Sequence, residues 1–258
     1  DHLIIVSDHP PSKNALSLAY HAVLLEGLKM AAQEDRIAAV ILVGRSGYFS
    51  AGGDLDFMLK SLNNEIDTTA DDIIGELQAC VSAIRDCPKP VIAAVTGGAA
   101  GGGFSIVMAC DLIVADESAM FMPAYAKIGF TPDGGLSSTL AQALPHPLAS
   151  EILLFGSPVA AETLQQHGLI NRLCQAGSAE QEATKLAEKL ARGSVSTQAK
   201  IKALLVAGST NTLADQLAFE QTSLLEVLGS AAAQEGINSF LEKRRPRLSQ
   251  SRGALNLE

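Results

Sequence analysis

The chain has 258 residues, a formal net charge of −9 and 47% hydrophobic residues. This length allows a substantial core in one large or two small domains, and the acidic balance argues against non-specific nucleic-acid binding. No apolar run is long enough for a membrane helix, and the first residues lack a basic region followed by a hydrophobic one, so we expect neither a membrane span nor a signal peptide. The four cysteines lack C-x-x-C spacing and the five histidines lack metal-ligand spacing, so we expect reduced thiols, a cytoplasmic protein and no metal.

The first part of the chain alternates short apolar strands with helices. A strand at residues 3–6 leads into the proline-rich turn HPPSKNA, and Ser17 then occupies a favourable N-cap position. Apolar residues at three- and four-residue spacing predict a helix whose buried face consists of Tyr20, Val23, Leu24, Leu28 and Ala31. A second strand at residues 39–43 precedes a glycine turn that contains the sequence FSAGGDL.

Residues 56–72 show no clean hydrophobic period, which predicts a mobile loop or a short helix. Thr68 or Thr69 is expected to cap the next helix, which runs to about Arg85. Its predicted buried stripe consists of Ile73, Ile74, Leu77, Val81 and Ile84.

The centre of the chain is the segment KPVIAAVTGGAAGGGFSIVMACD at residues 89–111. An apolar strand at 91–95, buried on both faces, runs into a glycine cluster and then into a buried helix. These glycines either let helix and strand pack closely or expose backbone N–H groups to an anion at the helix start. The spacing matches no dinucleotide, phosphate-loop or nucleophile-elbow motif.

The remaining chain is predicted as two short strands, a loop at 123–135 and then mostly helices. We expect strands at 112–115, 119–122 and 170–174, and helices at 136–144, 148–155, 160–167, 179–191, 197–207, 213–228 and 231–243.

The motifs FSAGGDL and KPVIAAVTGGAAGGG, in this order, resemble the signature of the crotonase family, also called the enoyl-CoA hydratase/isomerase superfamily. HPPSKNALS near the start and EGINSFLEKRRP near the end resemble its terminal motifs, so the resemblance covers nearly the whole chain. It implies an α/β fold with a spiral of repeated β-β-α units at residues 1–193 and a helical trimerisation or lid region at 194–258. It also implies a homotrimer or a dimer of trimers, with the tail covering the site.

The resemblance further implies that backbone amides of Gly53 and Gly102 hold the oxygen of a CoA thioester. Coenzyme A enters as part of the substrate, so no separate cofactor is expected. Lys13 either meets a CoA phosphate or is a solvated lysine, and Asp54 is equally a turn or cap residue. The other residues that the resemblance places against the CoA ester are Ala51, Leu55, Tyr125, Phe240 and Lys243.

The acid that performs the chemistry is the open question. Hydratases of this family use two glutamates, and the matching positions here hold Ser105 and Tyr125. Asp133, in the sequence PDGG, resembles the single acid of Δ3,Δ2-enoyl-CoA isomerases, although an aspartate in such a turn also caps a helix.

The resemblance therefore implies an isomerase in which Asp133 moves a proton while the double bond shifts from C3 to C2. One alternative is a hydratase or another enolate chemistry on a CoA ester. The other alternative is a CoA-ester-binding protein without catalysis.

Overall fold

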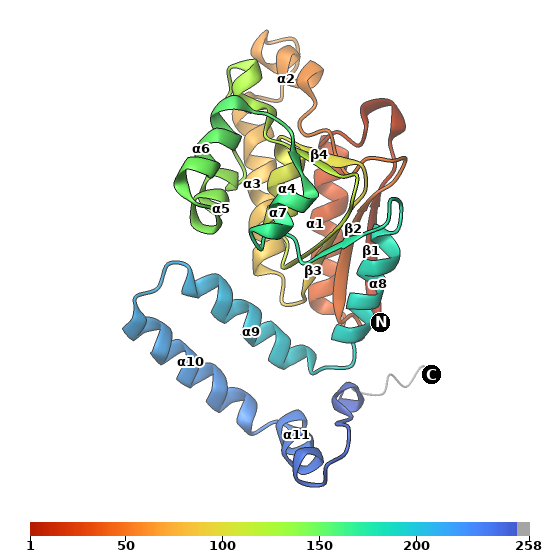
Figure 1. Ribbon diagram of the computed structural model, residues 1–258, viewed down its shortest axis with the longest axis vertical. Helices are drawn as coiled ribbons and strands as arrows, with labels where there is room; N and C mark the ends of the chain where they lie inside the picture. The colour runs from red at the N-terminus through yellow and green to blue at the C-terminus, as the bar shows by residue number, and fades with distance from the viewer. Residues whose placement is uncertain (252–258) are drawn as a thin grey trace.

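The computed structural model describes residues 1–251 and is organised around two β-sheets (Figure 1). The larger sheet has the strand order β1-β2-β3-β5-β8, and all its pairs are parallel. Its strands are β1 (His2–Ser7), β2 (Ala39–Gly44), β3 (Val91–Val95), β5 (Leu112–Asp116) and β8 (Arg172–Cys174). The smaller sheet consists of β4 (Gly98–Ala100), β6 (Met120–Met122) and β7 (Val159–Ala160), with β6 and β7 antiparallel.

From β3 to β6, consecutive strands alternate between the two sheets. β3 and β5 lie in the larger sheet, while β4 and β6, which follow them in the chain, pair in the smaller one. Helix α4 (Gly102–Ala109) follows β4, which gives the expected β-β-α unit. The strand β4 was not expected, because its sequence Gly-Ala-Ala carries none of the β-branched or aromatic residues that mark strands.

Helices cover both faces of the larger sheet. Alternate residues of β2 and β3 contact α1 (Leu18–Gln33) and α3 (Ala70–Asp86) on one face and α8 (Ala179–Leu190) on the other. Figure 1 shows α8 on the side opposite α3 and α4. Both strands are fully buried as a result, which explains why their sequences carry no polar alternation.

The predicted caps are present, and the helix faces need two corrections. Ser17 Oγ accepts a hydrogen bond from the Tyr20 backbone N–H, and Thr69 forms a capping box with Asp72. Val23 was expected to be buried but is 57% exposed, while His21 is only 2% exposed. The stripe of α1 that faces α3 passes through residues 21, 24, 28 and 31. Likewise, α3 buries residues 77, 80 and 84 and leaves residue 74 largely outside the core.

The segment at 56–72 forms the short helix α2 (Leu55–Leu62) and a loop. Beyond β6 the chain continues through η2 (Ala124–Ile128), α5 (Leu136–Ala143), α6 (His146–Phe155) and α7 (Ala161–Gln166), while η1 (Pro10–Ser12) precedes α1. No helix of residues 1–251 is long and apolar enough to cross a membrane.

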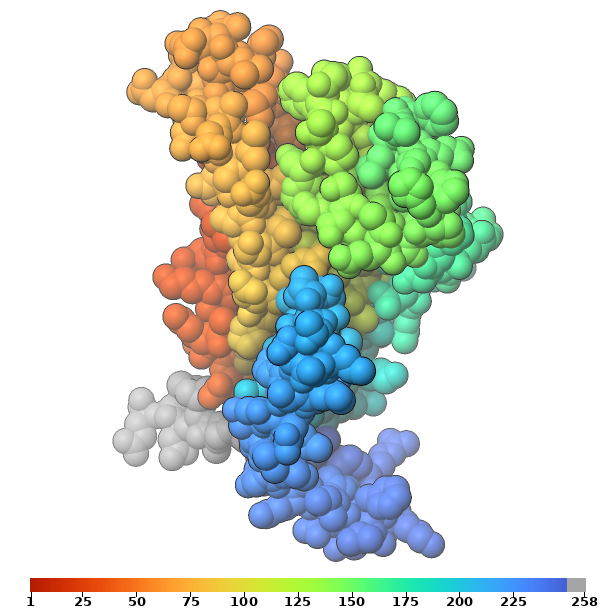
Figure 2. All heavy atoms as spheres, turned by 90° about the vertical axis from the view of Figure 1, so that its left-hand side faces the viewer, coloured from red at the N-terminus to blue at the C-terminus, as the bar shows by residue number. Residues whose placement is uncertain are grey.

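The tail helices form an arm beside the core (Figures 1 and 2). They are α9 (Val195–Gly208), α10 (Leu213–Leu228) and α11 (Ala231–Leu241), followed by η3 (Leu248–Ser251). Lys202 on α9 is buried, and its Nζ lies 2.7 Å from Asp111 Oδ2 and 2.7 Å from the carbonyl oxygen of Ile84. This ion pair, in which only Lys202 is fully buried, anchors the arm, and Asp111 also accepts the Val91 backbone N–H.

Candidate active site

The two glycine turns are in direct backbone contact. The Ala100 N–H donates to the Ser50 carbonyl across 2.9 Å. Gly52 has a φ of +89°, and a Cβ built on it would lie 2.6 Å from the Ala100 carbonyl oxygen. Only glycine permits this conformation and this approach. The turns after β2 and β3, far apart in sequence, therefore form one surface.

Two backbone amides of this surface remain available. Gly102 is the first residue of α4, and Gly53 precedes Asp54, the N-cap of α2. Neither N–H donates a hydrogen bond to another group among residues 1–251. Free amides at a helix start, together with the helix dipole, favour negative charge. The pair is suited to stabilise an oxyanion.

A cavity of about 130 Å³ contains both glycines. It lies between the α2–α3 segment and the segment that begins at η2, which Figure 2 shows on either side of a hollow in its upper half. The predicted site residues that line it are Ala51, Gly53, Asp54, Leu55, Gly102, Tyr125 and Asp133. Most of the remaining wall is apolar and comes from Leu16, Met58, Ile73, Ile74, Leu77, Ile128 and Phe130.

Asp133 accepts hydrogen bonds from Tyr125 and Ser105, the residues that stand where hydratases of the resembled family have glutamates. The Tyr125 hydroxyl donates to Asp133 Oδ1 across 2.6 Å, and Ser105 Oγ donates to the Asp133 carbonyl oxygen across 3.0 Å. Ser105 Oγ and Tyr125 Oη are themselves 3.1 Å apart. The capping alternative for Asp133 is wrong, because the N-cap of α5 is Gly135 and no side chain caps that helix.

Burial controls the charge states at this site. It raises the pKa of Asp133 above the usual carboxyl range, while the hydrogen bond from Tyr125 acts in the opposite direction. Burial and the nearby Asp133 charge raise the pKa of Tyr125, so the phenol stays protonated and acts as a donor. Asp54 has a different task, since its Oδ1 accepts the Phe57 N–H as the cap of α2.

Three predicted contacts of the CoA ester are not at this cavity. Lys13 is exposed, with its Nζ 5.9 Å from the centre of the Tyr48 ring. Phe240 is 82% exposed near the end of α11, and Lys243 follows that helix. Figure 1 places α11 at the opposite end of the molecule from α2. The expectation that the tail covers the site is therefore not met within one chain, because the arm leads away from it.

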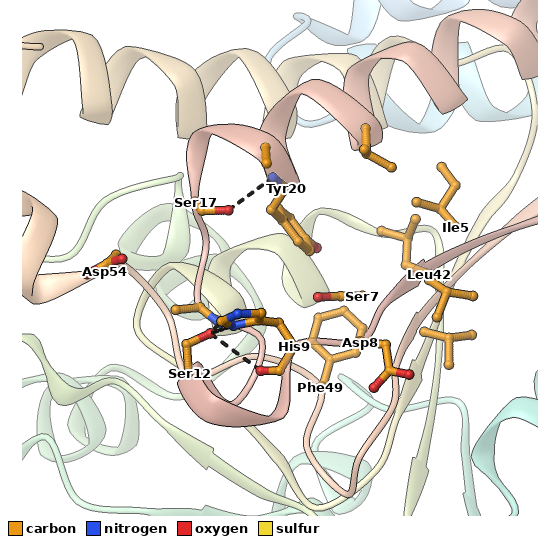
Figure 3. A pocket seen from close by; sticks show the side chains of 15 residues that line it. Ile5, Ser7, Asp8, His9, Ser12, Ser17, Tyr20, Leu42, Phe49 and Asp54 are labelled. Atoms are coloured by element: carbon orange, nitrogen blue, oxygen red, sulfur yellow. Dashed lines mark hydrogen bonds between the residues drawn. The ribbon is translucent and has the colours of Figure 1, made fainter.

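A second cavity, of about 450 Å³, lies beside the turn that carries Lys13 (Figure 3). Its lining includes His9 and Ser12, whose Nδ1 and Oγ are 2.7 Å apart, and the helix cap Ser17. Asp54 lines both cavities. The two spaces therefore approach each other at the start of α2.

Sequence reasoning missed two polar residues at this site, namely Ser105, which bonds the Asp133 backbone, and His21, which lines the cavity. Ser105 was considered only as a lost glutamate, although its position opposite Tyr125 is the signal that could have placed it next to Asp133. His21 lines the cavity from α1, and nothing in its spacing distinguished it from the other histidines. Within residues 1–251 no cluster of three or more histidine, cysteine or acidic side chains could hold a metal ion.

Comparison with known proteins identifies the family of the chain. The model of the enoyl-CoA hydratase/isomerase family matches residues 3–251. A protein of Rhodobacter capsulatus named probable enoyl-CoA hydratase is 36% identical, over 94% of this chain and 92% of its own length. The 1,2-epoxyphenylacetyl-CoA isomerase of Escherichia coli is 30% identical, over 96% of this chain and 94% of its own.

The crystal structure of an enoyl-CoA hydratase from a Polaromonas species has the same fold. It superposes with a TM-score of 0.90 at 39% identity and covers 94% of each chain. The repeated β-β-α architecture is thus that of the crotonase superfamily. Because the family model matches almost the whole length of the chain, the chain belongs to the enoyl-CoA hydratase/isomerase family.

Proposed function

We propose that this enzyme is an acyl-CoA isomerase that moves a double bond of its substrate from C3 to C2. The observation that carries the proposal is the position of Asp133 in the same cavity as Gly53 and Gly102. Its Oδ1 accepts the Tyr125 hydroxyl, and its own backbone N–H also bonds the carboxyl group. The carboxylate is thus oriented by hydrogen bonds while Asp133 still lines the cavity that receives the substrate.

The chemistry needs only one carboxylate. Asp133 takes a proton from C2 of a 3-enoyl thioester, and the electrons move toward the thioester oxygen to give a dienolate. The same proton then returns at C4, so isomerisation adds and removes no atom. The amides of Gly53 and Gly102 stabilise the charge on the oxygen, with about 3 kcal/mol from each donor.

The pKa of Asp133 supports this role. A base works best when its pKa is near the operating pH, and burial raises the pKa of this carboxyl toward that range. The hydrogen bond from Tyr125 limits this rise in the pKa of Asp133. It also fixes the orientation of the carboxylate plane. Ser105 positions the loop by its bond to the Asp133 carbonyl.

The two cavities divide the substrate between them. The apolar lining of the smaller cavity suits an acyl group. The larger cavity, which meets it at Asp54, gives room for the coenzyme A portion beside the turn of Lys13. Phe240 and Lys243 would contact the CoA ester only from a neighbouring chain. The exposed apolar residues of the arm support such an assembly, a trimer or a dimer of trimers.

The test is the conversion of a 3-enoyl-CoA into the conjugated 2-enoyl-CoA, followed by ultraviolet absorbance. Asp133→Asn should reduce turnover by about 10²–10⁴-fold, the usual contribution of a general base. Binding of a saturated acyl-CoA should persist, because the amides and the apolar wall are unchanged. Full activity in the variant would refute the role of Asp133.

Hydration of a 2-enoyl-CoA is the second candidate, since a relative at 36% identity carries the name of a hydratase. Water addition uses an acid and a base, and the positions of the two glutamates hold Ser105 and Tyr125 instead. Adding 2-enoyl-CoA to the enzyme separates the candidates, because a hydratase consumes the conjugated ester and forms the 3-hydroxy ester. Turnover in either assay excludes the alternative of a non-catalytic CoA-ester-binding protein.

A further inference from the structure

His21 is a buried histidine whose ring nitrogens have no hydrogen-bond partner among residues 1–251. It lies in the first half of α1 and is 2% exposed. Both ring nitrogens are buried and make no hydrogen bond with any group in residues 1–251. A buried polar group without a partner destabilises a fold. Packing alone therefore does not account for a histidine at this position.

His21 lines the same cavity as Asp133 and the two glycine amides. The surrounding wall is mostly apolar, with Leu16 and Leu77 on the neighbouring elements. The carboxylates and the phenol of the cavity already make hydrogen bonds within the protein. His21 is thus a polar side chain of this cavity that makes no hydrogen bond within residues 1–251, and its ring nitrogens can pair with a ligand.

The charge of His21 narrows the kind of ligand. Burial lowers the pKa of His21, and the negative charge of Glu76 only partly opposes this. The ring is therefore neutral near neutral pH, with one N–H donor and one acceptor nitrogen. No lysine or arginine lines the cavity, so a carboxylate would lack a countercharge.

A hydroxyl group matches this ring best. It can donate to the bare nitrogen or accept from the N–H, so it suits either tautomer of His21, whereas a carbonyl can only accept. The apolar wall strengthens such a hydrogen bond because the local dielectric is low. A ligand without a polar group would leave the ring unpaired, which is how a site built for a hydroxyl discriminates.

We propose that His21 binds a hydroxyl group on the acyl part of the substrate, so that the enzyme selects hydroxyl-substituted acyl-CoA esters. This inference rests on the proposed function, because it takes the cavity to be the acyl pocket. It assigns His21 to specificity and leaves proton transfer to Asp133.

The test compares matched pairs of esters that have no alkene double bond to shift and therefore bind without reacting. The pairs are hexanoyl-CoA with 6-hydroxyhexanoyl-CoA and phenylacetyl-CoA with 4-hydroxyphenylacetyl-CoA, and calorimetry gives each dissociation constant. The wild-type enzyme should bind at least one hydroxyl ester about 10-fold more tightly than its parent ester. His21→Leu should bind both members of that pair equally, and His21→Gln, which keeps a donor and an acceptor, should retain a preference.

Thermal unfolding gives an independent readout. His21→Leu should melt at or above the temperature of the wild type, because it removes two unpartnered polar atoms from the interior. The inference is overturned if the wild type prefers neither hydroxyl ester, or if His21→Leu keeps the full preference.

The outcome also separates this inference from the proposed function. Because the esters do not react, the result is independent of the activity of Asp133→Asn. If the wild type binds none of the four esters, the assignment to CoA esters fails and this inference fails with it.

Discussion

The Tyr125 hydroxyl donates a hydrogen bond to Asp133 Oδ1 across 2.6 Å. Tyr125 stands where hydratases of the resembled family have a glutamate, so a carboxylate position now holds the donor that orients the remaining carboxylate. The bond is charge-assisted when Asp133 is ionised, and such bonds are stronger than neutral ones. It fixes one oxygen of Asp133, and it lowers the pKa of the Asp133 carboxyl group.

Tyr125→Phe should move the acidic limb of kcat/KM to higher pH. Asp133 acts as a base only when ionised, so the rate rises with pH through its pKa. Burial already raises that pKa, and the bond from Tyr125 lowers it, so loss of the phenol raises it further. Initial rates across the pH range measure the shift.

Tyr48→Phe is the matched control, because Tyr48 does not line the cavity and its loss should leave the limb in place. An acidic limb at the same pH in Tyr125→Phe and in the wild type would show that the phenol does not act on Asp133.

Gly52→Ala should destabilise the protein and abolish activity. The φ of +89° disfavours alanine, and its Cβ would meet the Ala100 carbonyl oxygen at 2.6 Å. The expected loss of unfolding free energy is about 1–3 kcal/mol, measured by chemical denaturation. Gly53→Ala is the control for stability, since a Cβ there meets nothing within 4 Å. Equal stability of the two variants would contradict the close approach of the turns.

Lys202→Met should destabilise the protein by about 1.5–3 kcal/mol, because it removes the charged donor that bonds Asp111 and the Ile84 carbonyl. Lys200→Met on the same helix removes an exposed ion pair with Glu226 and should change stability by less than about 1 kcal/mol. Urea unfolding of both variants makes the comparison. A loss below 1 kcal/mol in Lys202→Met would show that this pair does not anchor the arm.

Light scattering should give a molar mass in solution that corresponds to three or six chains. Large apolar side chains on α10 and α11, such as Leu213 at 76% and Phe240 at 82% exposed, need a covering surface. Leu213→Glu should weaken the assembly, whereas Gln221→Glu adds a charge at an exposed polar position of the same helix and should not. A wild-type mass of one chain would contradict the proposal.

Local rules of sequence predicted much of the fold. The caps at Ser17 and Thr69 follow from side chains that satisfy free N–H groups. Periodicity located α1, but it did not decide which neighbouring stripe faces the core, so Val23 was expected inside where His21 is buried. That choice depends on how α1 packs on α3, which no local pattern contains.

The residues of the candidate site were likewise predicted only in part. The resemblance brought Gly53, Gly102 and Asp133 into one site, and all three line one cavity. It did not show the hydrogen bonds of Tyr125, because a lost glutamate says nothing of what its replacement contacts. Phe240 was expected at the site, but the direction in which a helical arm leaves the core depends on tertiary packing.

The most direct test of the central claim is a crystal structure with a bound saturated acyl-CoA. The account predicts that the thioester oxygen lies about 3 Å from the amide nitrogens of both Gly53 and Gly102. It also predicts that Oδ2 of Asp133 faces C2 and C4 of the acyl group. A thioester oxygen away from these amides, or an Asp133 carboxylate turned from the acyl carbons, would contradict it.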